Sequence, residues 1–207
     1  MRIIKSDACV AEGAAWLAQQ DARFSAALEV TGPLPLRLRD DGFGELFSAI
    51  ISQQVSVASA NAIWEKLCNA GLNDESAVAS ATEDDLRACG LSRQKIRYGL
   101  ALAQAKIDYE NLRCVSSADV IKTLTGVPGI GPWTAEIYAM FSLGHADVFP
   151  PGDLALQEAA KVLFDLPERP KERAFRKMAL DWSPWQSVAA RLLWAYYKHI
   201  KTRDGIR

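Results

Sequence analysis

The sequence has few of the features that mark specialised protein classes. Its 207 residues include only four cysteines, and no two of them have the short spacing that a zinc or iron-sulfur site needs. No apolar run approaches the ~20 residues of a membrane-spanning helix, and the first residues show no signal-peptide core. We therefore expect reduced thiols, no metal, no cofactor, no membrane contact and a cytoplasmic protein, associated with the nucleoid if the source is bacterial.

The net charge is only −1, because the sequence has 24 basic and 25 acidic residues. The charge is nevertheless unevenly spread, since residues 1–86 sum to −7, residues 87–160 to zero and residues 161–207 to +6. A basic C-terminal segment is compatible with DNA binding, but solvated helix faces produce the same pattern. Charge alone leaves nucleic-acid binding open.

The chain does contain many amphipathic segments of helical length. Alternating β-branched stretches are scarce, and Gly or Pro interrupts the Ala-rich sequence at intervals, which favours an all-α fold. An apolar stripe with helical spacing predicts a helix from Phe43. Further helices are predicted over residues 83–89, 92–111 and 117–124, the last capped by Ser116, and a final helix is predicted to start at Ser183-Pro184.

The pair Gln53-Gln54 interrupts the apolar stripe that begins at Phe43. A further apolar side chain is expected at position 54, where the helical period would continue. Taken by themselves, the two glutamines are best explained as a satisfied polar pair at a helix kink.

Three glycines fall within the six residues G-V-P-G-I-G at 126–131, between two helical patterns. Glycine permits positive φ and close approach by another molecule, and Pro132 suits the first turn of the next helix. The N–H groups at that helix start form an anion site, for which a DNA phosphate is one candidate. A tight helix-helix connection explains the glycines equally well.

Asp153 follows a Pro-Pro-Gly turn and precedes an Ala-rich helix. Asp is a preferred N-cap residue, so capping alone accounts for its presence. The same N–H groups and the helix dipole stabilise negative charge, so the carboxylate is also suited to stabilise a developing cation.

Five segments together resemble the helix-hairpin-helix (HhH-GPD) DNA glycosylases, and within them the 3-methyladenine DNA glycosylase II group. The segments are FxxLFSAIISQQVSVASA from Phe43, LSRQKIRYGLALA from Leu91, VPGIGPWTA from Val127, VFPPGDLAL from Val148 and WSPWQSVAARLLW from Trp182. The resemblance implies a monomer with two helical subdomains flanking a DNA-binding cleft. One would span residues 45–150 and carry the helix-hairpin-helix at about 117–143, and the other would combine residues 1–44 and 151–207.

The resemblance also implies an activity, namely hydrolytic release of alkylated purines of the 3-methyladenine and 7-methylguanine type in base excision repair. The partner would be double-stranded DNA with the damaged base flipped out. Asp153 would be the catalytic carboxylate. Trp133 stands where bifunctional relatives have a nucleophilic lysine, which implies that lyase activity is absent.

The resemblance assigns DNA contacts to the hairpin and to the interrupted helix. Gln54 would fill the gap that the flipped base leaves in the duplex. The complete set of predicted DNA contacts is Gly126, Gly129, Ile130, Gly131, Thr134, Gln53 and Gln54.

Aromatic residues are expected to bind a cationic base, because a well-placed ring attracts it by about 0.5 to 2 kcal/mol. Trp133 is the first candidate, Trp185 and Trp182 are further candidates, and the remaining tryptophans are expected to be structural. Relatives have tyrosines at the positions of Ile137 and Leu154, so the pocket is less aromatic than theirs and the substrate range stays open.

Two alternatives remain. The protein is a glycosylase for another lesion, such as hypoxanthine or ethenoadenine, or it is a non-catalytic helix-hairpin-helix module that binds DNA or scaffolds a repair complex. The presence of Asp153 together with Trp133 favours an enzyme, because a pure binding module needs neither.

Overall fold

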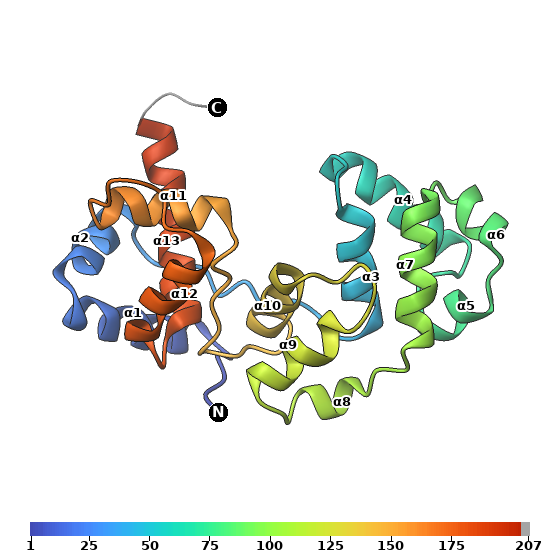
Figure 1. The fold of residues 1–207 in the computed structure, drawn as a ribbon, viewed down its shortest axis with the longest axis horizontal. Coiled ribbons are helices and arrows are strands. Elements are labelled where there is room, and N and C mark those ends of the chain that lie inside the picture. Colours follow the sequence, from blue (N-terminus) through green and yellow to red (C-terminus); the bar gives the residue numbers. More distant parts are fainter. Residues whose placement is uncertain (204–207) are drawn as a thin grey trace. The chain divides into compact units, whose positions relative to one another are not determined.

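The computed structural model describes residues 1–203. Over this range the chain forms thirteen α-helices and one 3-10 helix and has no β-strand beyond a single bridge between Ile3 and His145, which confirms the all-α prediction (Figure 1). None of the helices in this range is both long and apolar enough to cross a membrane.

The chain divides into two compact units. The first combines residues 1–38 with the chain from Ala139 onward, and the second is Arg39–Tyr138. The domain limits inferred from the sequence, 45–150 and the two flanking segments, stay predictions, as does the DNA-binding cleft.

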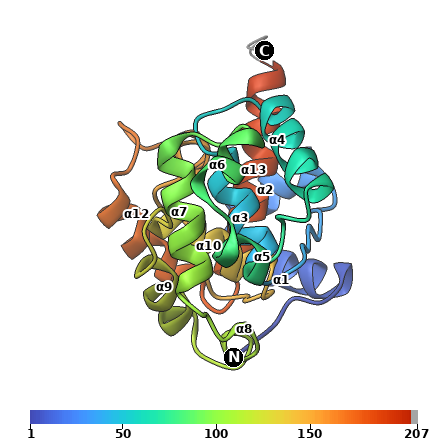
Figure 2. The same cartoon turned by 90° about the vertical axis from the view of Figure 1, so that its right-hand side faces the viewer.

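The second unit is built around α7, which packs against α3, α5 and α6 and lies at the front of Figure 2. The apolar stripe predicted from Phe43 is buried along α3. The helices predicted over 83–89 and 117–124 are confirmed as α6 and α9, and Ser116 caps α9 by accepting the N–H of Asp119. The helices are α3 Phe43–Ser52, α4 Val57–Asn69, α5 Glu75–Ser80, α6 Glu83–Ala88, α7 Arg93–Gln104, α8 Tyr109–Leu112, α9 Ser117–Thr125 and α10 Pro132–Phe141, which continues into the first unit.

The helix predicted over residues 92–111 is wrong in its second half. α7 ends at Gln104, and Lys106 adopts a positive φ of 47°. The carboxylate of Asp108 then accepts the N–H of Asn111 and starts the short helix α8. A side chain that bonds to a nearby backbone N–H competes with helix continuation, and here it starts a new helix.

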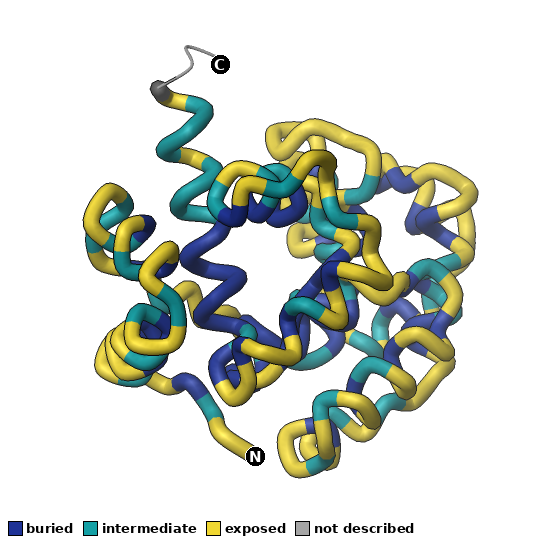
Figure 3. Tube along the Cα trace, turned by 60° about the vertical axis from the view of Figure 1, so that its left-hand side comes forward, coloured by how far each residue is buried: buried dark blue, intermediate teal, exposed yellow. Residues whose placement is uncertain are grey.

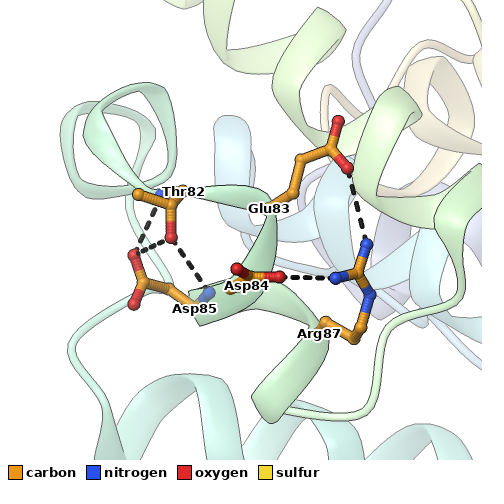
Figure 4. Close-up of polar contacts among 5 residues, drawn as sticks. All are labelled: Thr82, Glu83, Asp84, Asp85 and Arg87. Atoms are coloured by element: carbon orange, nitrogen blue, oxygen red, sulfur yellow. Dashed lines mark hydrogen bonds and ion pairs between the residues drawn. The ribbon is translucent and has the colours of Figure 1, made fainter.

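Helix α6 shows how side chains set a helix start in this unit (Figure 4). The Thr82 hydroxyl accepts the Asp85 N–H at 3.2 Å, and the Asp85 carboxylate accepts the Thr82 N–H at 2.9 Å. Arg87 forms ion pairs with Glu83 and Asp84 within the same helix. The two reciprocal bonds satisfy N–H groups that no helical carbonyl can reach.

The first unit is organised around α13, which packs against α1, α2 and α11. The α13 trace is buried over residues 187–193 and becomes more exposed after them (Figure 3). The helices of this unit are α1 Asp7–Gln20, α2 Ala22–Thr31, α11 Leu154–Leu163, α12 Glu172–Ala179, the 3-10 helix Leu180–Trp182 and α13 Gln186–Arg203.

The predicted start of the last helix at Ser183-Pro184 is wrong. α13 begins at Gln186, and the Ser183-Pro184 peptide bond is cis. The Ser183 hydroxyl donates to the Asp147 carboxylate at 2.7 Å instead of accepting a helix N–H. A tertiary contact with the segment that precedes Asp153 therefore takes the place of the expected cap.

Candidate functional site

Asp153 is the N-cap residue of α11. Its Oδ1 atom accepts the N–H groups of Ala155 at 2.9 Å and Leu156 at 3.1 Å, and its own N–H donates to the Pro150 carbonyl at 3.1 Å. Two amide donors and the positive end of the helix dipole fix the carboxylate and stabilise its negative charge. The Asp153 carboxylate can therefore cap α11 and, at the same time, stabilise a nearby cation.

Two polar side chains that sequence reasoning missed hold the chain around Asp153. Gln157 is 9% exposed, and its Nε2 donates to the Pro151 carbonyl at 2.7 Å, which secures the Pro-Pro-Gly turn. The buried Ser187 hydroxyl contacts the carbonyls of His145 at 2.6 Å and Val148 at 2.9 Å. A glutamine one helical turn after the cap was the available signal for Gln157.

The three hairpin glycines meet different demands. Gly129 has a φ of +94°, and a Cβ atom there would clash with the Tyr98 ring. Gly126 has an ordinary φ of −69° and ends α9. A Cβ atom on Gly131 would meet nothing within 4 Å. Of the three, Gly131 is the one at which an added Cβ atom would meet open space.

The hairpin uses some of the N–H groups that were predicted to bind phosphate. The N–H of Ile130 donates to the Val127 carbonyl at 3.1 Å, and the N–H of Gly126 donates to the Thr123 carbonyl at 3.3 Å. The side chain of Ile130 is buried as well. These two residues thus serve the internal structure of the hairpin.

Other predicted phosphate donors remain available. The N–H groups of Gly129, Gly131 and Thr134 have no acceptor among residues 1–203. Gly131 and Thr134 adjoin the N-terminal end of α10, where the helix dipole favours an anion.

Gln53 and Gln54 have separate roles in the structure. The Gln53 Nε2 donates to the Gly129 carbonyl at 2.9 Å and so connects the end of α3 to the hairpin. Gln54 has a positive φ of 58°, and its side chain is exposed. The polar-pair interpretation accounts for Gln53, whereas Gln54 projects outward.

The three candidate tryptophans are not equivalent. Trp133 lies in the first turn of α10 and is 47% exposed. Trp185 is 3% exposed, with the Arg2 guanidinium 4.6 Å from its ring centroid and Gly13 packed against the ring.

Trp182 belongs to an aromatic core. It is 5% exposed, and four phenylalanine rings surround it with centroid separations from 5.1 to 6.0 Å. Packing on this scale covers the faces of the indole, so the surroundings of Trp182 and Trp185 are those of core residues. Trp194, expected to be structural, is half-buried beside Phe141 at a centroid distance of 5.8 Å.

Comparison with known proteins identifies what this architecture is similar to. The model of the HhH-GPD superfamily, described as base excision DNA repair proteins, matches residues 47–184. The protein YfjP of Bacillus subtilis is 29% identical over 183 residues, which are 82% of this chain and 64% of that protein, so the chain spans less than two thirds of this relative.

Two solved structures share the fold. A DNA-3-methyladenine glycosidase from Bacillus halodurans superposes with a TM-score of 0.80 and 31% identity, over 94% of this chain and 91% of that one. The 3-methyladenine DNA glycosylase Mag1 of Schizosaccharomyces pombe, solved in complex with abasic DNA, superposes with a TM-score of 0.74 and 28% identity, over 88% of this chain and 95% of that one.

Proposed function

The chain belongs to the HhH-GPD superfamily of base excision DNA repair proteins, and we propose that it is a monofunctional DNA glycosylase acting on alkylated purines. The substrates are bases of the 3-methyladenine and 7-methylguanine type in double-stranded DNA. The observation that carries the proposal is the carboxylate of Asp153, which two amide N–H groups fix at the start of α11. The names of the relatives support the choice of alkylated bases.

Asp153 acts on the sugar. An N-alkylated purine carries positive charge and is already a good leaving group, so its departure needs little acid catalysis. Cleavage of the glycosidic bond leaves an oxocarbenium-like sugar, which a fixed carboxylate stabilises electrostatically. The same carboxylate orients the attacking water and accepts its proton.

Trp133 and Gln54 act on the base and on the duplex. The exposed indole of Trp133 offers a π-face to the cationic base, an attraction of about 0.5 to 2 kcal/mol that the neutral parent base does not share. Gln54, which we call the wedge residue, enters the duplex as the damaged nucleotide leaves it, and its amide can hydrogen-bond the partner base. Burial in the core removes Trp182 and Trp185 from this proposal.

The hairpin sequence supports the proposed absence of lyase activity. A Schiff base with the sugar requires an amine, and the position after Pro132 that carries a lysine in bifunctional relatives is Trp133 here. Hydrolysis by this enzyme would therefore leave an intact strand with an abasic site.

The test is release of free base from methylated duplex DNA, with strand breaks scored before and after alkali. We expect wild-type protein to release 3-methyladenine or 7-methylguanine and to cause breaks only after alkali. Asp153→Asn should retain fold and DNA binding, since Asn caps helices as well as Asp, but should lose at least about 100-fold in rate. The exposed Asp165 in the same unit provides Asp165→Asn as the matched control.

Three outcomes would contradict the proposal. Full activity of Asp153→Asn would return Asp153 to the role of an ordinary helix cap. Tight DNA binding by the wild type without release of any alkylated base would favour a binding module or another lesion. Strand breaks before alkali, together with a borohydride-trapped adduct, would show a lyase.

A further inference from the structure

Helix α3 ends against a buried lysine from another helix. Lys95 lies in the first turn of α7 and is 8% exposed, and its Nζ donates to the Ile51 carbonyl at 2.6 Å. Because α3 ends at Ser52, this carbonyl is one of the last four that no N–H of the helix can reach. The ammonium supplies the donor that the helix itself lacks.

Burying the Lys95 ammonium costs free energy. The hydrogen bond to the Ile51 carbonyl offsets part of this cost. Burial lowers the pKa of Lys95, and the first turn of α7 carries the positive end of its own helix dipole. No carboxylate among residues 1–203 lies within ion-pair distance of its ammonium. The compensating partner is the C-terminal end of α3, where the backbone carries partial negative charge.

The turn that follows α3 has an unusual backbone. Gln53 is extended, and Gln54 adopts a φ of +58°, which residues other than glycine seldom adopt. Lys95 donates a hydrogen bond to the Ile51 carbonyl, two residues before this turn. Gln53, which is part of the turn, donates a hydrogen bond to the Gly129 carbonyl in the hairpin. Gln54 and Lys95 also line one hollow of about 260 Å³, which leaves space for the turn to shift if the ammonium is removed.

We propose that Lys95 is a positioning residue for the wedge. It ends α3 at Ser52 and so maintains the turn that presents Gln54 to DNA. This inference rests on the proposed function, because Gln54 is a wedge only if the protein flips nucleotides. The competing explanation is that Lys95 merely stabilises the core through its aliphatic stem.

A double-mutant cycle separates the two explanations. Wild type, Lys95→Met, Gln54→Ala and the double variant are compared in single-turnover release of 7-methylguanine. The same proteins are compared by fluorescence of 2-aminopurine beside an abasic-site analogue, which reports nucleotide flipping. Met keeps the aliphatic stem but removes the donor, and Lys66→Met removes an exposed lysine of the same unit as the control.

If Lys95 acts through Gln54, Lys95→Met lowers the release rate about 10-fold in the wild-type background and less than about 2-fold in the Gln54→Ala background. The flipping signal falls with the same non-additivity, and Lys66→Met changes neither. Equal losses in both backgrounds would overturn the inference and leave Lys95 a core residue. If Lys95→Met does not fold, the cycle is measured with Lys95→Arg, which keeps the charge but changes the donor geometry.

Failure of the proposed function can be told apart from failure of this inference, because wild-type protein would then release no base.

Hydrogen exchange of the free protein tests the inference independently of activity. Lys95→Met should accelerate exchange at residues 52–56 and leave helix α1, which belongs to the other unit, unchanged. Unchanged exchange at residues 52–56 would overturn the inference even in an active enzyme.

Discussion

Gly129 and Gly131 lie two residues apart in the hairpin, but only Gly129 is tightly packed. The positive φ and the Tyr98 ring require glycine at position 129 for reasons internal to the fold. At position 131 the φ is not positive and the surrounding space is open. Neither a positive φ nor packing against a neighbour requires glycine at position 131, which is compatible with close approach by an external molecule.

Alanine substitutions at the two positions should have different effects, one on the stability of the fold and the other on DNA binding. Gly129→Ala should lower the free energy of unfolding by about 2 to 4 kcal/mol, because it combines backbone strain with overpacking against Tyr98. Gly131→Ala should change the free energy of unfolding by less than about 0.5 kcal/mol. If a DNA phosphate approaches the hairpin there, as the family resemblance implies, the added methyl group should nevertheless weaken DNA binding several-fold.

Urea denaturation and DNA titration measure the two effects. Equal stability of the two variants would show that Tyr98 yields to the added methyl group. Unchanged DNA affinity of Gly131→Ala would remove the hairpin N–H groups near it from the phosphate contacts.

Helices α4 to α9 of the second unit each begin where a short polar side chain accepts a backbone N–H group. α6 is the most complete case, since Thr82 and Asp85 satisfy each other's N–H groups. Hydrogen bonds from the Thr82 hydroxyl, and next from its N–H, lower the pKa of Asp85. The start of this helix is thus stabilised by a carboxylate that must remain ionised.

Thr82→Ala should lower the free energy of unfolding by about 1 kcal/mol at neutral pH, the usual cost of losing a cap. The lowered pKa means that the contribution of Asp85 is present above its unfolded value near 3.8 and is lost as pH falls through the folded value. The difference between wild type and variant should therefore shrink in acid. Thermal melts over a pH series check this, with Ser80→Ala at the end of α5 as the control; a difference independent of pH would contradict the reciprocal cap.

The first unit joins segments from both ends of the chain and encloses a histidine. His145 has no exposed surface, and its carbonyl accepts the hydroxyl of Ser187 from α13. Burial, and next the charge of the N-terminal amine, lowers the pKa of His145. The folded protein therefore binds a proton at this site less readily than the unfolded chain.

Stability should consequently fall as pH drops below the unfolded value of 6.5, because the unfolded state then binds the extra proton. His145→Asn should flatten this dependence between about pH 7.5 and 5, whereas His199→Asn in α13 should preserve it. Melting temperatures by circular dichroism provide the measurement. An unchanged slope in His145→Asn would mean that another group controls the pH dependence.

Local interactions made much of this molecule predictable from its sequence. The all-α class, the buried stripe of α3, the position of α9 and its Ser116 cap follow from helical periodicity and from hydrogen bonds between residues three apart. Asp153 could be recognised as an N-cap for the same reason. The helix over residues 92–111 and the start at Ser183 were mistaken where a competing side-chain bond decided the outcome.

The amino-acid sequence alone was enough to establish the all-α class, helices such as α3, α6 and α9, the family motifs and the identity of the groups that can do chemistry. Only the tertiary structure separated Trp133 from the buried Trp182 and Trp185, and the exposed Gln54 from Gln53, which bonds to Gly129. It also brought Lys95 to the end of α3. Helical periodicity and capping depend on neighbours within a few positions, whereas burial and the partner of a polar side chain depend on residues far away in the chain.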